Sequence, residues 1–526
     1  MTTSRRIFLK GMLATPAAFG TFPIFSSFAQ TAGGGALTVA IMKPAGDLNP
    51  HKYSGLWGVQ DLIFEPLIRY GRNGEALPCL ATEWTLDEGG KLLRLKLRQG
   101  VTFQDGTAWN AESCMWNLDR WIGKDAQNWM NLSRAYESKK IIDGNTIEIR
   151  FKEPVLGLLY ELSFIRPSRF LSPKSVDKDG TFQTPVGTGP WIQDSATNEG
   201  SSFRRFDGYW GDKPSFERLE LKVLPDSRSR MAALRAGEID LTGGDFLAPL
   251  TANEATTLKK AGIEVSVETG TTTIVLGFNP DRNAALKDAR VRKAINIGFD
   301  RAAIAQVLYQ GLAQPAGNFF APTVPMAGKR VDVPKRDVAA AKALLEEAGW
   351  TGDDIREKDG KPLAVELVAS EEQIAGSRAV AEVMQAQLRE IGIELTIRSI
   401  DHASRHSDIP ARKYDMAFFL TFGAPYEPFG SIVGLFLSTY DNGVDGKLFL
   451  DAQNLDPLVT AVMQASEANI ETALQNIYDW LHAEAAVAPL LYVPSMWAHS
   501  PRVKGFTPPT TEYDLPYEGI TLSEQG

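Results

Sequence analysis

The sequence predicts an α/β protein built from two or three packed lobes. Residues 376–392 have the apolar spacing of a long helix, and residues 393–397 then alternate as a strand, which makes a helix-to-strand unit. Asp337 stands at the N-cap position of another helix over residues 338–349, which closes on a glycine. Length is the third observation, because removing a predicted leader of residues 1–29 leaves 497 residues, too many for one core.

Four further segments have strand patterns. Residues 36–41 follow a glycine-rich joint at residues 33–35 and predict a short buried strand, where the folded domain begins. Residues 92–97 and 146–151 each alternate apolar with polar side chains, which predicts half-buried strands. Residues 414–420 predict another strand, downstream of the helix-to-strand unit.

The N-terminus has the features of a twin-arginine export leader. An arginine pair at residues 5–6 precedes an uncharged stretch at residues 11–29, and the small residues Ser27 and Ala29 allow cleavage after Ala29. The alternative, an ordinary core helix, is disfavoured because two prolines and two glycines interrupt the stretch. We therefore expect export across the cytoplasmic membrane, with no cysteine near the cut to carry a lipid.

The net charge limits the classes of partner, and the cysteine content limits the disulfides that the chain can form. The leader holds three cations and no acid, so the formal charge of −9 becomes −12 in the mature chain, which argues against nucleic acid as a partner. This acidity keeps a large surface soluble, or concentrates cationic ligands around it. Cys79 and Cys114 can pair in an oxidising compartment, but the apolar pattern around Cys114 equally predicts a thiol buried on a helix.

Motifs of catalysis are missing from the sequence. The five histidines include no i, i+4 pair with a glutamate between them, and there is no Gly-x-Ser-x-Gly elbow. Residues 187–190 lack the spacing and the lysine of a phosphate loop and are interpreted as a turn. We expect a binding protein and not an enzyme. The 11 tryptophans, 13 tyrosines and 26 phenylalanines, although mostly core, supply rigid surfaces that close over a solute.

Six short motifs occur along the chain in a specific order. They are LNPH at 48–51, IFEPL at 63–67, LRQGVTFQDG at 97–106, GTGPW at 187–191, GEIDL at 237–241 and VRKAI at 291–295. In this order, and with further matches at 209–214 and 341–350, they resemble the large periplasmic solute-binding proteins of the peptide and nickel class. This class, bacterial extracellular solute-binding protein family 5, hands ligands to ABC importers. The match covers essentially the whole mature chain.

The resemblance implies a type II, cluster C periplasmic binding protein, with two α/β lobes, a hinge and an extra inserted domain. Lobe I would take residues 33–70, 190–270 and 499–526, the inserted domain 71–189, and lobe II 271–498. The lobes would close on a ligand, and the closed shape would be recognised by the permease subunits and their cytoplasmic ATPases. The resemblance also implies a monomer without a covalent cofactor, any nickel–chelator complex being the ligand.

The segment FGAPYEP at residues 422–428 distinguishes between ligands. Peptide-binding relatives carry an aspartate where Pro425 stands, and that carboxylate pairs with the ammonium of the peptide. The form found here resembles the nickel-binding members, which implies a nickel or related metal chelate. A di- or oligopeptide or an opine-like carboxylate solute is the alternative, with Glu427 or Asp514 supplying the missing acid. A structural or chaperone-like envelope protein without a ligand is the second alternative.

The resemblance also assigns site residues. It implies ligand contacts from Arg166, Trp129, Tyr426, Phe422, Thr511 and Trp57. Arg166 matches the arginine that clamps the chelate in nickel-binding members, and its planar fork suits a carboxylate. The alternative is that Arg166 or Arg169 merely neutralises a structural acid.

The sequence departs from the nickel-binding pattern at several positions. Phe422 stands where a tryptophan is usual, Phe429 replaces a histidine, and residues 438–440 replace the loop histidine that ligates the metal. His406 is the candidate substitute, because a neutral imidazole binds nickel or copper well. The alternative is a solvated loop histidine. If the chelator supplies every donor, the protein needs only Arg166 and an aromatic box.

Overall fold

The computed structural model describes residues 35–52, 54–244, 247–440, 446–466, 468–515 and 517–523, except for the side chain of His402. The predicted leader, residues 1–29, lies outside the described residues. Within these ranges, every helix is too short or too polar to cross a lipid bilayer.

The described chain alternates helices and strands. The helices are α1 (Trp57–Ile63), α2 (Ala111–Trp121), α3 (Asn131–Ala135), α4 (Leu158–Glu161), α5 (Ser227–Arg235), α6 (Ala252–Lys260), α7 (Ala289–Gly298), α8 (Arg301–Tyr309), α9 (Val338–Glu347), α10 (Ser377–Arg389), α11 (His402–Asp408), α12 (Phe429–Phe436), α13 (Leu455–Met463) and α14 (Ile470–Ala483). The strands are β1 (Ala36–Ile41), β2 (Ile68–Tyr70), β3 (Ala76–Pro78), β4 (Ala81–Asp87), β5 (Leu92–Leu97), β6 (Tyr136–Asp143), β7 (Thr146–Phe151), β8 (Trp191–Ala196), β9 (Gly200–Arg205), β10 (Arg218–Val223), β11 (Leu241–Gly243), β12 (Glu264–Phe278), β13 (Gln314–Pro315), β14 (Glu357–Lys358), β15 (Lys361–Pro362), β16 (Ala364–Ala369), β17 (Glu394–Ser399), β18 (Met416–Leu420), β19 (Val487–His499), β20 (Val503–Lys504) and β21 (Thr521–Leu522).

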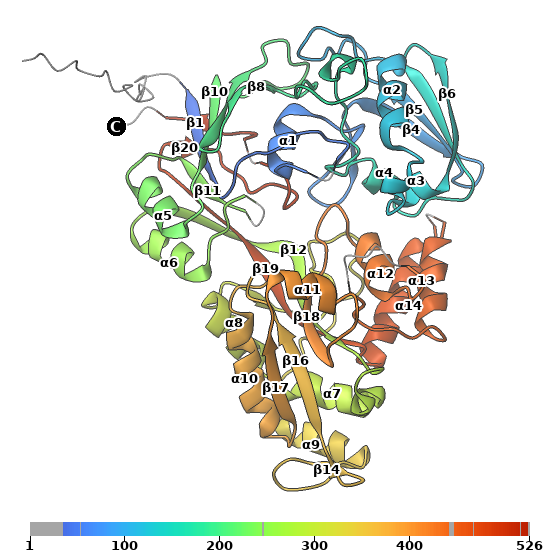
Figure 1. Cartoon of the computed structure of the whole chain (residues 1–526), viewed down its shortest axis with the longest axis vertical. Coiled ribbons are helices and arrows are strands. Elements are labelled where there is room, and N and C mark those ends of the chain that lie inside the picture. Colours follow the sequence, from blue (N-terminus) through green and yellow to red (C-terminus); the bar gives the residue numbers. More distant parts are fainter. Residues whose placement is uncertain are drawn as a thin grey trace, which may run out of the picture. The chain divides into compact units, whose positions relative to one another are not determined.

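The largest sheet is mixed. Its order is β17-β16-β18-β12-β19-β11-β1-β10-β9-β8, with β13 also paired to β19. The long strands β12 and β19 pair antiparallel, from Glu264 opposite His499 to Gly277 opposite Val487. Figure 1 shows them running together, with β16, β17 and β18 toward one end and β1, β10 and β11 toward the other. These two strands therefore connect the two ends of the sheet.

The predicted helix-to-strand unit is confirmed as α10 followed by β17. β17 and β18 both run parallel to β16, so the carboxyl ends of all three strands meet at one edge of the sheet. The predicted helix after Asp337 is α9, and the Asp337 side chain accepts a hydrogen bond from the Ala340 amide at 2.9 Å. The predicted strands over residues 36–41, 92–97, 146–151 and 414–420 are confirmed as β1, β5, β7 and β18.

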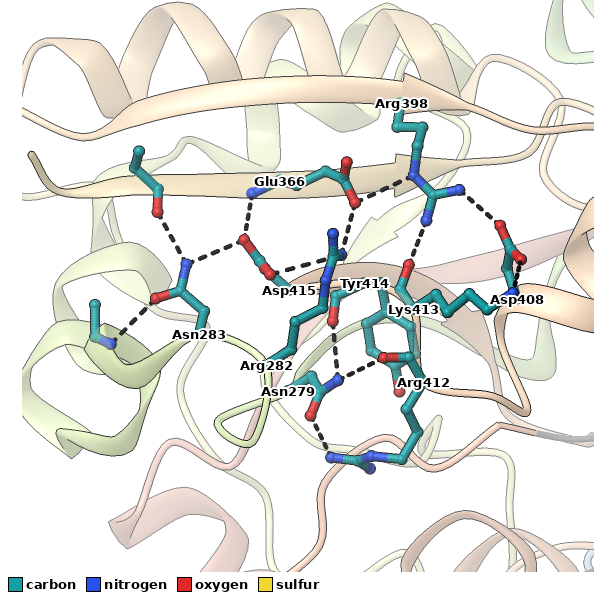
Figure 2. Close-up of polar contacts among 12 residues, drawn as sticks. Asn279, Arg282, Asn283, Glu366, Arg398, Asp408, Arg412, Lys413, Tyr414 and Asp415 are labelled. Atoms are coloured by element: carbon teal, nitrogen blue, oxygen red, sulfur yellow. Dashed lines mark hydrogen bonds and ion pairs between the residues drawn. The ribbon is translucent and has the colours of Figure 1, made fainter.

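A polar network holds the amino end of β18 against its neighbours (Figure 2). Asp415 Oδ2 accepts hydrogen bonds from the Glu366 amide of β16 at 2.9 Å and from Asn283 Nδ2 at 3.0 Å. Arg398 of β17 donates to Glu366 Oε1 at 3.1 Å and to Asp408 Oδ2, at the end of α11, at 2.8 Å. The network therefore holds β16, β17, β18 and α11 together.

A separate antiparallel sheet, β4-β5-β7-β6, lies within residues 81–151. Its apolar side chains form a core together with α2, which carries Cys114. Cys114 and Cys79 are both buried and both free, so the alternative of a disulfide is wrong and the alternative of a buried thiol is confirmed for Cys114. Burial raises the pKa of both thiols, which keeps them protonated.

Three of the recognised motifs meet at one buried carboxylate. Glu65, in IFEPL, is fully buried. It accepts hydrogen bonds from Thr188 Oγ1 of GTGPW at 2.8 Å, and from Tyr209 Oη at 2.9 Å and Trp210 Nε1 at 2.7 Å in the match at residues 209–214. Motifs more than 100 residues apart are therefore joined by one side chain, which explains why their order carries structural information.

The glycines of GTGPW are required by close packing. A Cβ at Gly187 would lie 1.9 Å from the carbonyl oxygen of Ile63, the last residue of α1, and a Cβ at Gly189 would lie 2.7 Å from it. The Gly189 amide donates to this same carbonyl at 2.9 Å. The segment interpreted as a turn thus bends against the end of α1 and orients that helix.

Candidate functional site

Five aromatic rings and an arginine come together from five separate segments of the chain. The rings are Trp57, Trp129, Phe164, Tyr426 and Tyr513, which we call the aromatic cluster. Ring centroids lie 4.3 Å apart for Phe164 and Tyr426, and 4.5 Å apart for Trp57 and Tyr513. Trp129 stacks on Phe164 at 6.0 Å with 3° between the planes, and Tyr426 meets Tyr513 edge to face at 5.4 Å. Such a cluster presents flat apolar surfaces with polar edges.

Arg166 lies against this cluster. Its side chain is buried, with the residue 4 % exposed, and its Cζ lies 4.4 Å from the centroid of the Trp57 ring. Its Nη1 donates to the carbonyl oxygens of Ser54 at 2.9 Å and of Lys52 at 3.3 Å. The planar cation is thereby held over an aromatic face, in the arrangement that suits a bidentate carboxylate.

Arg169, three residues after Arg166, has a structural role. Its Nη2 forms an ion pair with Asp61 Oδ1 of α1 at 3.0 Å, and both side chains are 5 % exposed. Its Nη1 donates to the carbonyl oxygens of Ser163 and Phe164, each at 2.8 Å. The alternative in which an arginine of this segment neutralises a structural acid is therefore confirmed for Arg169.

Glu161, the last residue of α4, ties together the segments that carry Trp129 and Arg166. Its two carboxylate oxygens accept from the amides of Asn131 at 2.8 Å and Leu132 at 2.7 Å, at the start of α3. Its carbonyl accepts from Ser168 Oγ at 2.6 Å. Burial raises the pKa of Glu161 to about 7 although both amide hydrogen bonds favour the charged form.

Tyr426 and Phe422 come from the loop between β18 and α12, at the carboxyl edge of the parallel strands, where ligand crevices of α/β sheets open. The carbonyl of Phe422 accepts a hydrogen bond from Tyr513 Oη at 2.8 Å. Its ring lies against α12, because a Cβ at Gly434 would be 3.0 Å from it. Phe422 therefore joins the aromatic cluster through its backbone, while its ring packs on the helix.

Glu427 stabilises this loop from inside. It is fully buried, and its Oε1 accepts from the Gly423 amide at 2.9 Å and from Ser431 Oγ at 2.7 Å. Burial raises its pKa to about 8, so it is mostly protonated at neutral pH. Of the two acids weighed as partners for a ligand ammonium, Glu427 is thus used by the loop itself.

A cavity of about 440 Å³ lies beside the aromatic cluster. Its lining includes Pro425, Thr511, Tyr513, Asp514, Arg69 and Arg72. Tyr513 belongs both to this lining and to the aromatic cluster, so the cavity and the cluster are neighbours. A volume of this size is in the range that holds small solutes.

Comparison with known proteins identifies the family. Residues 75–443 match the model of bacterial extracellular solute-binding proteins, family 5. The chain belongs to this family. It is 30% identical over 497 residues to the nickel-binding periplasmic protein of Escherichia coli K12, covering 92% of this chain and 94% of that relative.

Two solved structures of family 5 proteins have the same fold as this chain. An ABC transporter substrate-binding protein from Sinorhizobium meliloti is 58% identical with a TM-score of 0.86, covering 93% of this chain and 100% of that one. NikA from Brucella suis, solved with Fe(III)-EDTA, is 32% identical with a TM-score of 0.85 over the same shares. The protein is thus a family 5 solute-binding protein of ABC import, with the two-lobed α/β fold of periplasmic binding proteins.

His406 is the predicted metal ligand of this family 5 protein. His406 is exposed in the last turn of α11, so its interpretation as a loop residue is wrong, although its solvation is confirmed. Among the described residues, no group of three or more His, Cys, Asp and Glu side chains is placed to hold a metal. Tyr440, near the position of the missing loop histidine, donates to the Trp129 carbonyl at 3.4 Å.

The structure thus brings four of the predicted ligand contacts together, namely Trp57, Trp129, Arg166 and Tyr426, and places Thr511 on the neighbouring cavity. Sequence reasoning missed Phe164 and Tyr513. Phe164 precedes Arg166 by two residues and Tyr513 follows Thr511 by two residues, so proximity to assigned residues was the available signal.

Proposed function

We propose that this protein captures a nickel chelate or a related metal chelate in the periplasm and delivers it to the permease of its importer. The observation that carries the proposal is the Arg166 guanidinium, held over the Trp57 ring in the aromatic cluster. The relatives named for nickel and for Fe(III)-EDTA support a chelate as cargo. Pro425 adds to this support, because it leaves the peptide-binding position without a carboxylate.

In this proposal the chelator supplies the donors to the metal and the protein binds the chelator. Arg166 takes a carboxylate of the chelate, and the aromatic cluster contacts its apolar edges and excludes water. Lobe I would comprise residues 33–70, 190–270 and 499–526, the inserted domain 71–189, and lobe II 271–498. The paired strands β12 and β19 pass between lobes I and II and would act as the hinge. A closed monomer would then be recognised by the permease subunits with their ATPases.

Arg166→Ala is expected to weaken binding of Ni(II)-EDTA by more than about 1.5 kcal/mol, or roughly tenfold, because a hydrogen-bonded charge pair is lost. Arg166→Lys should recover only part of the affinity, since an ammonium cannot form the bidentate fork. Isothermal titration measures both.

Arg218→Ala is the matched control, because Arg218 is half exposed on β10 and forms ion pairs with Asp194 and Glu220. Its affinity should equal that of the wild type. If Arg166→Ala also binds with wild-type affinity, Arg166 is not part of the site.

The second candidate function is import of a peptide or an opine-like carboxylate solute. The observation in its favour is Asp514, whose carboxylate lines the cavity together with Pro425. Native mass spectrometry and metal analysis of protein purified from the periplasm separate the two functions. A bound di- or tripeptide without affinity for a metal chelate would replace the first proposal by the second.

We also propose export by the twin-arginine route with cleavage after Ala29. Replacing both arginines of the pair, by Arg5→Lys with Arg6→Lys, is expected to remove at least nine tenths of the mature protein from the periplasm. Cell fractionation with immunoblotting measures this loss. Lys10→Arg, which alters a leader cation outside the pair, is the control. Unchanged export of the double variant would exclude the route.

A further inference from the structure

One glutamate contacts both segments that form a stacked aromatic pair in the candidate site. Trp129 lies parallel to Phe164, with 3° between the ring planes. The Glu161 side chain accepts hydrogen bonds from the amides of Asn131 and Leu132, which closely follow Trp129 along the chain. Its main-chain carbonyl accepts from the Phe164 amide at 3.4 Å. The stack therefore forms where α3 and α4 pack together, with Glu161 between its two segments (Figure 1).

The same residue also contacts the segment that carries the cation of the site. The Glu161 carbonyl accepts from Ser168 Oγ at 2.6 Å. Arg166 lies between Phe164 and Ser168 in the sequence, so both ends of its segment contact this one carbonyl. The Glu161 side chain thus holds the Trp129 segment, while its main chain holds the Arg166 segment.

The start of α3 depends on the Glu161 carboxylate. Within the described chain, the N-cap residue Met130 gives this helix no side-chain hydrogen bond. The Asn131 and Leu132 amides donate instead to the two Glu161 oxygens, at 2.8 and 2.7 Å. An ionised carboxylate accepts at both oxygens, whereas a protonated one carries a hydroxyl donor on one of them. Protonation therefore leaves one of these amides poorly satisfied, next to the segment of Trp129.

Glu161 changes its charge in the neutral pH range. Burial raises its pKa to about 7, against the opposing hydrogen bonds of the two amides and the charge of Arg134 on α3. β2 packs on the same helix, where Tyr70 meets the ring of Tyr160 at 5.7 Å. Burial raises the pKa of both tyrosines, so they stay neutral while Glu161 titrates.

We propose that Glu161 is a positioning residue of the binding site, which holds Trp129 against Phe164 while it is ionised and loosens the start of α3 when it takes up a proton. The inference rests on the proposed function and deepens it, because it adds a regulation by pH to the same site. Trp129 is half-buried, so part of its surface remains available to a solute. A solute bound against Trp129 requires the ordered arrangement, and its affinity is therefore highest above pH 7 and falls as the pH drops through 7.

A fluorine probe on tryptophan tests the positioning without any ligand. The protein is labelled with 5-fluorotryptophan, and the Trp129 resonance is assigned as the one that Trp129→Phe removes. We expect this resonance to shift between pH 5.5 and pH 8.5 with a midpoint of about 7, and to stay at its low-pH position throughout in Glu161→Gln. A wild-type resonance that does not shift overturns the inference, whether or not the variant folds.

Glu137→Gln is the matched control, because Glu137 is exposed on β6, two residues after the end of α3. Its Trp129 resonance should titrate as in the wild type. The variants are needed because two other buried carboxyl groups, Asp514 and Glu427, also have raised pKa values. An equal shift in Glu161→Gln and in the wild type would assign the titration to another group and overturn the inference.

Calorimetric titration with Ni(II)-EDTA measures the consequence for binding. Glu161→Gln should weaken binding at least about fivefold at pH 8 but less than about twofold at pH 5.5, where the wild-type glutamate is itself protonated. In a Trp129→Ala background the same substitution should change the affinity by less than about twofold, because Glu161 acts through Trp129. Losses that simply add in the double variant would contradict the positioning role.

The two measurements separate the inference from the proposed function. If the wild type does not bind Ni(II)-EDTA, the proposed metal cargo is overturned and the fluorine titration alone decides the inference. If the chelate binds but the Trp129 resonance does not shift, only the inference is overturned.

Discussion

Replacing Glu65 with alanine is expected to lower the free energy of unfolding by about 3–5 kcal/mol. The carboxylate is fully buried and accepts from Thr188 Oγ1, Tyr209 Oη and Trp210 Nε1, with Arg69 Nη2 at 3.4 Å as well. Removing it leaves several buried donors without an acceptor and opens a cavity where three segments meet. Urea unfolding followed by circular dichroism measures the loss.

Two variants show whether this loss comes from the hydrogen bonds. Glu65→Gln keeps the volume and one acceptor oxygen, so we expect it to lose roughly half as much stability as the alanine variant. Glu217→Ala removes a glutamate whose side chain is 80 % exposed and should change stability by less than about 0.5 kcal/mol. An alanine variant as stable as the wild type would show that the three motifs do not depend on Glu65.

The second large effect is expected at the buried ion pair of Asp61 and Arg169. Arg169→Met removes the cation from a region that also holds Asp514, so two carboxylates remain close together in the interior. Breaking a buried pair from one side costs about 3–5 kcal/mol, because the remaining charge stays desolvated. Thermal and urea unfolding at pH 7 measure this loss directly.

The pH dependence of the Arg169→Met variant follows from Asp514. Its folded pKa is raised to about 7, so its protonated form contributes stability that is complete below the unfolded pKa near 4 and is lost as the pH rises through 7. Arg169 lowers this pKa, and its removal therefore moves the loss to higher pH and makes it larger. We expect the stability gap between variant and wild type to be wider at pH 8 than at pH 5.

Replacing both partners is the control for this pair. Asp61→Leu combined with Arg169→Met should recover most of the lost stability, because two apolar side chains leave no uncompensated charge. Unfolding at pH 8 gives the largest difference between the single and double variants. A double variant no more stable than Arg169→Met would show that packing, and not charge, accounts for the effect.

Local patterns in the sequence predicted two helices and five strands that the structure confirms. α9 has its predicted N-cap because Asp337 lies within one turn of the Ala340 amide, from which its side chain accepts a hydrogen bond. β5 and β7 were predicted because apolar and polar residues alternate with a period of two, which indicates the buried face of a strand. The cysteines had to be left open, because two buried thiols and a disulfide are equally compatible with the same sequence spacing.

The candidate site was predicted in part, and only through resemblance to a family. Arg166, Trp129, Trp57 and Tyr426 do meet, but the sequence could not distinguish the roles of Arg166 and Arg169, which lie three residues apart. Their difference depends on Asp61, which lies more than 100 residues away in the sequence and accepts a hydrogen bond from Arg169. The sequence predicts His406 as a metal ligand or a solvated loop residue, whereas the structure places it exposed in the last turn of α11.

The sequence by itself predicted two helices, five strands and the order of the motifs, and through that order the family, because these depend on residues close along the chain. Only the tertiary structure decided that three motifs share Glu65, that Tyr513 belongs to both the aromatic cluster and the cavity lining, and that Arg169 pairs with Asp61. The physical reason is that ring stacking and charge compensation act over a few ångströms in space. Such contacts join residues from distant segments, and local periodicity contains no information about them.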